Sequence, residues 1–153
     1  MKRVRHFVGF TLIELLIVIA IVAILTTIAA PAFSDLIAAQ RVKSAASTLQ
    51  SALYMTRSEA LKRNVNVTLA PVTTGQWNGA WSASLSDGTV LSNYNAVAQI
   101  SIANAPASVT FLGNGRISAS ADASFKLTSG ATATIRCVDI SLSGVPKISD
   151  SGC

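Results

Sequence analysis

A long apolar segment near the N-terminus constrains this 153-residue chain more than any other feature. Residues 15–30 carry no charge and almost no polar side chain. As a helix, residues 10–30 would be about 31 Å long, close to the ~30 Å hydrocarbon core of a bilayer. Basic residues at positions 2, 3 and 5 precede the segment, and the positive-inside bias keeps them in the cytoplasm. The simplest prediction is a single-span anchor with residues 34 onward in the periplasm or outside.

The apolar segment offers two sites at which a leader could be removed. An ordinary secretory signal is cut at small residues after its apolar region. The best such site, Thr27-Ile28-Ala29, is weak because more apolar residues follow it. A cut between Gly9 and Phe10, ahead of the apolar segment, would instead keep that segment in the mature protein.

Glu14 argues against a plain anchor. A carboxylate inside an apolar span is costly and usually marks a functional site. Its natural partner is the α-amino group that cleavage would create on Phe10. Within one chain the two groups are poorly placed, because both belong to the first helical turns. Between staggered neighbouring helices they can pair, and such a pair would fix register more than it would add stability.

The residues Gly9-Phe10-Thr11-Leu12-Ile13-Glu14 resemble the class III signal of type IV pilins and type II secretion pseudopilins. The resemblance implies cleavage after Gly9 by prepilin peptidase, N-methylation of Phe10, and helical polymerisation through the N-terminal helix. It implies a single-pass protein of the bacterial inner membrane, with a cytoplasmic N-terminus and a periplasmic head, that later enters a pilus or pseudopilus. Its expected partners are other minor pilins or pseudopilins and a major pilin.

The chain is therefore divided into a cleaved leader (1–9), a transmembrane and assembly helix (10–33), a periplasmic amphipathic half of that helix (34–63) and a β-rich head (64–153). Pro31 predicts a kink or local melting of the helix. An apolar stripe of helical spacing runs through the amphipathic half, and Asn64 ends the pattern. The stripe comprises Ile37, Val42, Ala45, Ala46, Leu49, Ala52, Leu53 and Ala60. The charged residues of this half, among them Arg57, are predicted to form a solvated face with a Glu59–Arg63 pair.

The second half of the chain predicts a small sheet domain. Turn signals lie at Asp87-Gly88 and at Gly113-Asn114-Gly115. Trp77 and Trp81 are interpreted as core residues of one strand rather than as a binding platform. The fold class is α+β, with a long helix packed on an antiparallel β domain, which is the pilin fold that the resemblance implies. Strands are predicted over residues 65–69, 77–85, 98–103, 108–112, 123–127 and 132–142.

The two cysteines, Cys137 and Cys153, lie close together near the C-terminus. An even count in an exported chain favours one disulfide, which would close a loop of about 16 residues and stabilise by roughly 3 kcal/mol. The alternatives are two free thiols or a metal pair. Two thiols alone are too few ligands for a typical zinc site, and the chain's one histidine is His6, in the leader. No metal or cofactor is predicted.

Three internal segments resemble the pseudopilin H and FimT–FimU group. They are Tyr54–Ala60, Gly75–Trp81 and Val109–Arg116. The resemblance covers nearly the whole chain and implies a minor pilin at or near the tip of a type IV pilus that supports pilus biogenesis. One alternative is pseudopilin H of a type II secretion pseudopilus, which acts in protein export and which the sequence does not separate from a pilus protein. The other is a DNA-binding minor pilin for natural transformation.

The basic residues of the chain bear on the DNA-binding alternative. Some FimT-like members share a Gly-Arg-x-Arg turn, but the matching stretch here is Gly144-Val145-Pro146-Lys147, which lacks both arginines. Of 12 Lys and Arg residues, three lie in positions 1–9, which leaves nine against seven acidic residues and a formal charge of +2. Phosphate affinity scales with the cations placed on the backbone. The candidate DNA contacts are Arg116, Arg136 and Lys147.

An enzyme is not predicted. The one histidine lies in the leader, the acids of the mature chain are scattered without a visible pair, and no glycine-rich phosphate loop is present.

Overall fold

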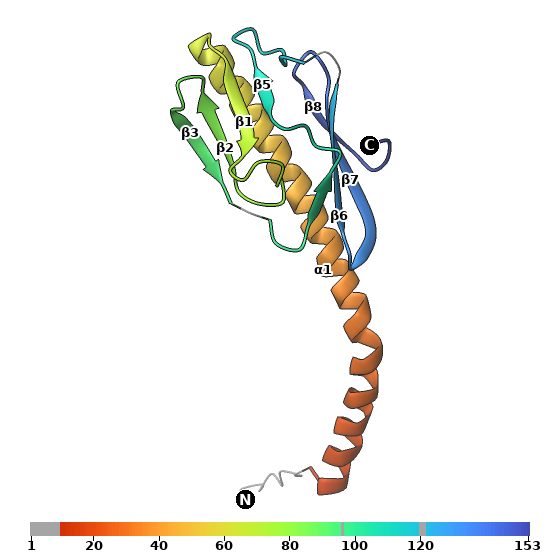
Figure 1. Ribbon diagram of the computed structural model, residues 1–153. Coiled ribbons are helices and arrows are strands. Elements are labelled where there is room, and N and C mark those ends of the chain that lie inside the picture. The colour runs from red at the N-terminus through yellow and green to blue at the C-terminus, as the bar shows by residue number, and fades with distance from the viewer. Residues whose placement is uncertain (1–9, 96, 120–121) are drawn as a thin grey trace, which may run out of the picture. The chain divides into compact units, whose positions relative to one another are not determined.

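The computed structural model describes residues 10–95, 97–119 and 122–153, with residues 28–32 described as helical backbone only (Figure 1). The predicted leader, including Gly9, lies outside the described residues. The chain divides into two compact units, Met1–Asp35 and Leu36–Cys153.

The first unit contains the N-terminal part of helix α1 (Leu12–Arg63). The hydroxyls of Thr26 and Thr27 donate to the carbonyls of Ala23 (2.9 Å) and Ile24 (2.7 Å). The helix continues through Pro31, against the expectation of local melting, and the kink stays a prediction. Across the described part of the chain, no helix has the length and apolarity needed to cross a membrane.

The second unit begins with the remainder of α1, whose buried positions recur every three or four residues as predicted. Ala38 takes the core-facing position that was expected one residue earlier, so Ile37 is exposed. The buried hydroxyl of Thr56 donates to the carbonyl of Ala52 at 2.7 Å and is therefore satisfied. The buried apolar positions of this part are Ala38, Val42, Ala45, Ala46, Leu49, Ala52, Leu53 and Ala60.

The end of α1 is a Schellman-type cap, which confirms the end predicted at Asn64. Asn64 has a left-handed backbone, with φ of 54°. The N–H groups of Asn64 and Val65 donate to the carbonyls of Leu61 and Ala60, both at 3.3 Å. Asn tolerates this conformation better than most residues, so the helix stops here and the chain turns into the first strand.

Two antiparallel four-stranded sheets lie against this part of α1 (Figure 1). The first has the order β3-β2-β1-β5, and the second has the order β4-β6-β7-β8. The α+β class and the antiparallel β head are confirmed. The strands of the first sheet are β1 (Val67–Pro71), β2 (Trp81–Leu85), β3 (Val90–Tyr94) and β5 (Val109–Phe111). Those of the second are β4 (Ser101–Ala103), β6 (Ala123–Ser129), β7 (Thr132–Ile140) and β8 (Pro146–Ser149).

Two strands, β3 and β8, are missing from the sequence prediction. Both are edge strands, so each is defined by pairing with one neighbour only, β2 for β3 and β7 for β8. β8 begins with Pro146, which is tolerated at the first residue of an edge strand because the strand needs no N–H there. The predicted strand 77–85 is also too long, since β2 begins at Trp81.

The tryptophans confirm the core interpretation, although Trp77 precedes the strand rather than sharing it with Trp81. Both are buried. The Nε1 of Trp77 donates to the Pro106 carbonyl at 2.6 Å, and the Nε1 of Trp81 donates to the Trp77 carbonyl. The Trp77 ring meets the ring of Phe125 at 4.8 Å and 78°, an edge-on contact. Because Phe125 lies on β6, Trp77 joins the two sheets.

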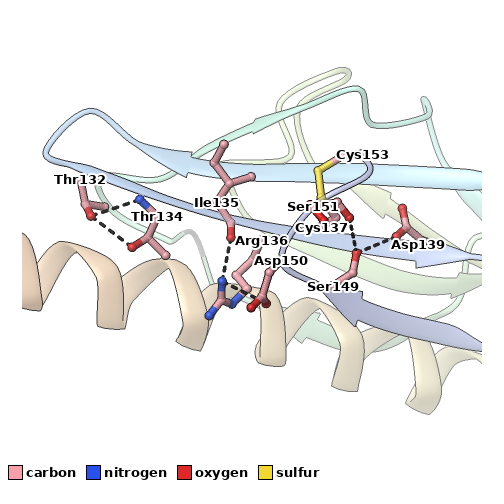
Figure 2. A network of polar contacts seen from close by, with 10 residues as sticks. All are labelled: Thr132, Thr134, Ile135, Arg136, Cys137, Asp139, Ser149, Asp150, Ser151 and Cys153. Atoms are coloured by element: carbon pink, nitrogen blue, oxygen red, sulfur yellow. Dashed lines mark hydrogen bonds and ion pairs between the residues drawn. A yellow bond between two sulfur atoms is a disulfide. The ribbon is translucent and has the colours of Figure 1, made fainter.

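A disulfide links Cys137 of β7 to Cys153, with 5.4 Å between the two Cα atoms (Figure 2). This confirms the predicted pairing and contradicts the two alternatives. The single O–H of Ser149 lies within hydrogen-bond distance of two acceptors, Asp139 Oδ2 at 3.2 Å and the Ser151 carbonyl at 3.0 Å. The C-terminal tail is therefore tied to the second sheet by covalent and polar contacts.

Candidate assembly site

Glu14 lies in the first turn of α1 and makes a capping box with Thr11. Its Oε2 accepts hydrogen bonds from the backbone N–H of Thr11 (2.8 Å) and from the Thr11 hydroxyl (3.0 Å). In return the N–H of Glu14 donates to the Thr11 Oγ1 at 3.3 Å. These bonds satisfy donors that a helix start leaves unpaired. The sequence analysis missed this role, although the Thr-x-x-Glu spacing is its signature.

The capping box uses only half of the Glu14 carboxylate. No hydrogen bond reaches Oε1 from the residues that the structure describes. The first turn of α1 fixes the position of the Glu14 carboxylate and leaves Oε1 without a hydrogen bond. Oε1 can therefore accept a hydrogen bond from a cation of another chain. Phe10, which would carry the new amine, is 88% exposed at the end of the described chain.

The surface that follows Glu14 is apolar around the whole helix. Every described side chain from residue 10 to residue 27 is exposed. A helix that is apolar on all sides is normally buried in a large assembly or a bilayer. This segment therefore needs a cover that its own unit does not supply.

A polar clamp joins the other end of α1 to two turns of the head. The Nε of Arg57 donates to the Gly115 carbonyl at 2.9 Å, and its Nη2 donates to the Ser143 carbonyl at 3.3 Å. Gln50 and Tyr54 both donate to the Pro146 carbonyl, at 3.3 and 3.1 Å. We call this set the Arg57 clamp. Gly115 follows β5 of the first sheet and Pro146 begins β8 of the second, so the clamp ties α1 to segments next to both sheets.

The clamp corrects the prediction of a uniformly solvated charged face. Arg57 is half-buried and bonded to the head, whereas Arg41 and Lys43 are exposed. The predicted Glu59–Arg63 pair is confirmed, with 2.7 Å between Arg63 Nε and Glu59 Oε2. The hydrogen bond from the Arg63 side chain lowers the pKa of Glu59.

The three candidate DNA contacts occupy different environments. Arg136 is held in an ion pair with Asp150 at 3.1 Å and donates to the Ile135 carbonyl (Figure 2). Arg116 follows the turn at Gly115, and Lys147 is exposed on β8. No hydrogen bond or ion pair joins any two of the three within the described ranges. Their cooperation in binding DNA stays a prediction.

Metal binding finds no support among the described residues. They contain no group of three or more His, Cys, Asp or Glu side chains placed to hold an ion, and both cysteines are in the disulfide.

Comparison with known proteins assigns the chain to a family. The model of the family described as Type II transport protein GspH matches residues 45–144, and the prokaryotic N-terminal methylation motif matches residues 9–30. No curated protein sequence matches the chain.

Two crystal forms of the type IV minor pilin FimU from Pseudomonas aeruginosa share the fold. One is 22% identical with a TM-score of 0.62, covering 74% of this chain and 90% of that chain. The other is 23% identical with a TM-score of 0.61, covering 70% and 91%. The pilin fold is thereby confirmed. Since the GspH model spans about two thirds of the sequence, this chain belongs to the GspH family of pilin-like subunits and carries the N-terminal methylation motif of prepilins.

Proposed function

We propose that this chain is a minor pilin that prepilin peptidase cleaves after Gly9 and that is assembled at or near the tip of a type IV pilus. The proposal rests on one observation. The same chain matches the methylation motif over residues 9–30 and the GspH family over residues 45–144. The fold shared with the type IV minor pilin FimU favours a pilus. Its role is structural rather than enzymatic.

In this proposal the N-terminal helix has two successive environments. Residues 10–33 first hold the protein in the inner membrane, with the leader in the cytoplasm and the head in the periplasm. Cleavage then creates the amine of Phe10, and the apolar surface moves from lipid to neighbouring helices. The open Oε1 of Glu14 accepts the amine of an adjacent copy or another pilin, which sets the stagger between the two helices.

A type II secretion pseudopilus is the second candidate, because the matching family is described as a type II transport protein. Both machines use the same leader and the same kind of pilin-like protein. We do not propose DNA binding, because no hydrogen bond or ion pair brings any two of Arg116, Arg136 and Lys147 together within the described ranges, and the Gly-Arg-x-Arg turn is replaced by Gly144-Val145-Pro146-Lys147.

Deletion of the gene tests the proposal and separates the two candidates. We expect loss of surface filaments in electron micrographs, with protein secretion unchanged, and restoration by the wild-type gene. Lost secretion with normal pili would establish the second candidate instead.

Gly9→Leu should retain the leader and fail to restore filaments. Gly130→Ala, in open space on the head, should be processed and should restore them. Normal leader removal from the Gly9→Leu chain, seen by mass spectrometry of its N-terminus, would contradict the cleavage site.

A further inference from the structure

The two cysteines of the disulfide differ sharply in exposure. Cys137 is fully buried, whereas Cys153 is exposed. Within the sheet, Cys137 has Lys126 of β6 opposite it on one side and Ser149 of β8 opposite it on the other. The C-terminal tail returns to the same place, because Cys153 is bonded there (Figure 2). A reagent that comes from solvent therefore meets Cys153 before it can reach Cys137.

An ion pair places the tail beside Cys137 without help from the sulfur atoms. The Nη1 of Arg136 lies 3.1 Å from the Oδ1 of Asp150. Arg136 directly precedes Cys137, and Asp150 is three positions before Cys153. The two cysteines themselves are 16 positions apart. Once the ion pair has formed, only the short segment after Asp150 is left to be ordered, so most of the entropy cost of closing the loop has already been incurred.

Ser149 supports this placement from β8. Its O–H lies within hydrogen-bond distance of Asp139 Oδ2 at 3.2 Å and of the Ser151 carbonyl at 3.0 Å. β8 is also paired with β7 from Cys137 to Ile140. None of these contacts uses sulfur, so all of them remain available to a folded head in which the disulfide is open.

We propose that this disulfide forms in the folded head by a fixed order of steps. Cys153 reacts with a disulfide-bearing oxidant, and Cys137 resolves the product. The thiolate of Cys153 attacks one sulfur of the oxidant, which gives a mixed disulfide and releases the other sulfur as a thiolate. The thiolate of Cys137 then attacks the Sγ of Cys153 and releases the second thiolate. The cysteines lose two electrons and two protons, and the oxidant is reduced to two thiols.

Arg136 and Asp150 are positioning residues for the second of these steps, because they hold Cys153 beside Cys137. The inference goes beyond the proposed function and does not depend on it.

Oxidation of the reduced full chain by glutathione disulfide, in detergent, tests the order of steps. Samples are quenched with N-ethylmaleimide at intervals and digested with trypsin. Cleavage after Arg136 and Lys147 places Cys137 in the peptide 137–147 and Cys153 in the peptide 148–153. We expect at least about tenfold more glutathione on the peptide 148–153 than on the peptide 137–147, because access governs the rate of exchange.

Two results of this experiment overturn the proposal. One is a glutathione adduct that is as abundant on the peptide 137–147 as on the peptide 148–153. The other is a reduced chain that has lost the near-ultraviolet circular dichroism of its buried tryptophans, since the proposed order requires a folded head.

Single-cysteine variants give the same comparison when closure is too fast for the adduct to accumulate. Cys137→Ala leaves Cys153, and Cys153→Ser leaves Cys137. Under native conditions the first variant should react with glutathione disulfide at least about tenfold faster than the second. In denaturant the two rates should agree within about twofold, because neither thiol is covered there. Rates that already agree under native conditions contradict the assigned order.

The closing step tests the ion pair. This step is intramolecular, so its rate does not depend on the concentration of glutathione disulfide, whereas the rate of the first step does. Asp150→Asn should slow closure about two- to fivefold, the range for an exposed ion pair, and Asp150→Glu should restore it. Ser151→Lys is the matched control, because it makes the same change in charge near Cys153 and keeps the ion pair. Equal closing rates in Asp150→Asn and Ser151→Lys would show that the ion pair does not position the tail.

Discussion

At the scale of single residues, the seam between the two sheets depends on glycines that leave no room for a side chain. Gly144 has a φ of 78°, and a Cβ built there would lie 2.0 Å from the Gly115 carbonyl oxygen. That same oxygen accepts the hydrogen bond from Arg57. Any side chain at position 144 must therefore push apart the two turns that the Arg57 clamp holds together.

Gly144→Ala should destabilise the head by about 2–5 kcal/mol, from a left-handed backbone cost and the forced movement of Gly115. Gly88→Ala is the matched control, because Gly88 has a φ of 87° with nothing near its Cβ. It should cost about 1–2 kcal/mol. Thermal unfolding of the full chain in detergent, followed by near-ultraviolet circular dichroism, measures the difference. Equal losses in the two variants would show that the contact with Gly115 is unimportant.

Tyr94 reports on burial at the edge of the first sheet. Its ring lies 6.2 Å from that of Trp81, and burial raises the pKa of its phenol above the ordinary value of 10.0, an effect that a Ser92 hydrogen bond partly opposes. A raised pKa in the folded state means that the folded chain holds the proton more tightly than the unfolded chain. The stability that the protonated Tyr94 phenol contributes is fully present below pH 10. It is lost as the pH rises through the pKa of Tyr94 in the folded state.

Absorbance titration of the phenol at 295 nm checks this expectation. In the variant Tyr54→Phe, Tyr94 is the one remaining tyrosine of the chain. We expect its midpoint above 10.0 in the folded protein and a return to the ordinary value in denaturant. A folded midpoint at or below 10.0 would contradict a buried phenol.

At the scale of elements, the C-terminal tail is fixed by three kinds of contact. The disulfide holds Cys153, the Arg136–Asp150 ion pair holds the residue after β8, and Ser149 bonds to Asp139 of β7. Asp150 is largely exposed, so the ion pair contributes little by itself. Of the three contacts that fix the tail, the disulfide is therefore expected to contribute most, beside the pairing of β8 with β7.

Reduction of the disulfide should lower the free energy of unfolding by about 3 kcal/mol, through the entropy gained by a loop of about 16 residues in the unfolded chain. Cys153→Ser is the cleaner variant, since Cys153 is exposed whereas Cys137 is fully buried. Denaturant unfolding with and without reductant measures the loss. The rate of amide hydrogen exchange should rise first in β8. An unchanged exchange rate in β8 would show that this strand does not depend on the disulfide-bonded tail.

At the scale of the whole molecule, Glu14 has two roles that can be separated. Within one chain it caps α1 through Thr11, and in an assembly its negative charge would meet the amine of a neighbour. The first role needs a hydrogen-bond acceptor, whereas the second needs a charge.

Glu14→Gln and Glu14→Ala should both be cleaved normally and should both enter filaments poorly, at less than about a tenth of the wild-type amount if the missing ion pair costs ~1.4 kcal/mol or more. Glu14→Gln keeps an oxygen that can cap Thr11, so it isolates the charge. Thr11→Val, which loses the cap and keeps the charge, should enter filaments almost as well as wild type. Immunoblots of sheared filaments give the amounts. Normal incorporation of Glu14→Gln would leave only the capping role.

The sequence alone determined the elements whose signals are local. The apolar segment, the stripe that ends at Asn64, the strong strand patterns and the pair of cysteines each depend on residues close together in the chain. The capping box at Thr11 and Glu14 is also a local signal, but it coincides with a costly carboxylate in an apolar span, which points first to a partner outside the chain.

Only the tertiary structure decided the features that join distant segments. β3 and β8 are strands because β2 and β7 offer them partners, and their own patterns are weak. Arg57 resembles any solvated helix cation until the turns at Gly115 and Ser143 place their carbonyls beside it, 58 and 86 positions away. Arg136 likewise becomes an ion-paired residue through Asp150. Periodicity records which face of an element is apolar, but the polar partner of a side chain is fixed by long-range packing, which local sequence does not encode.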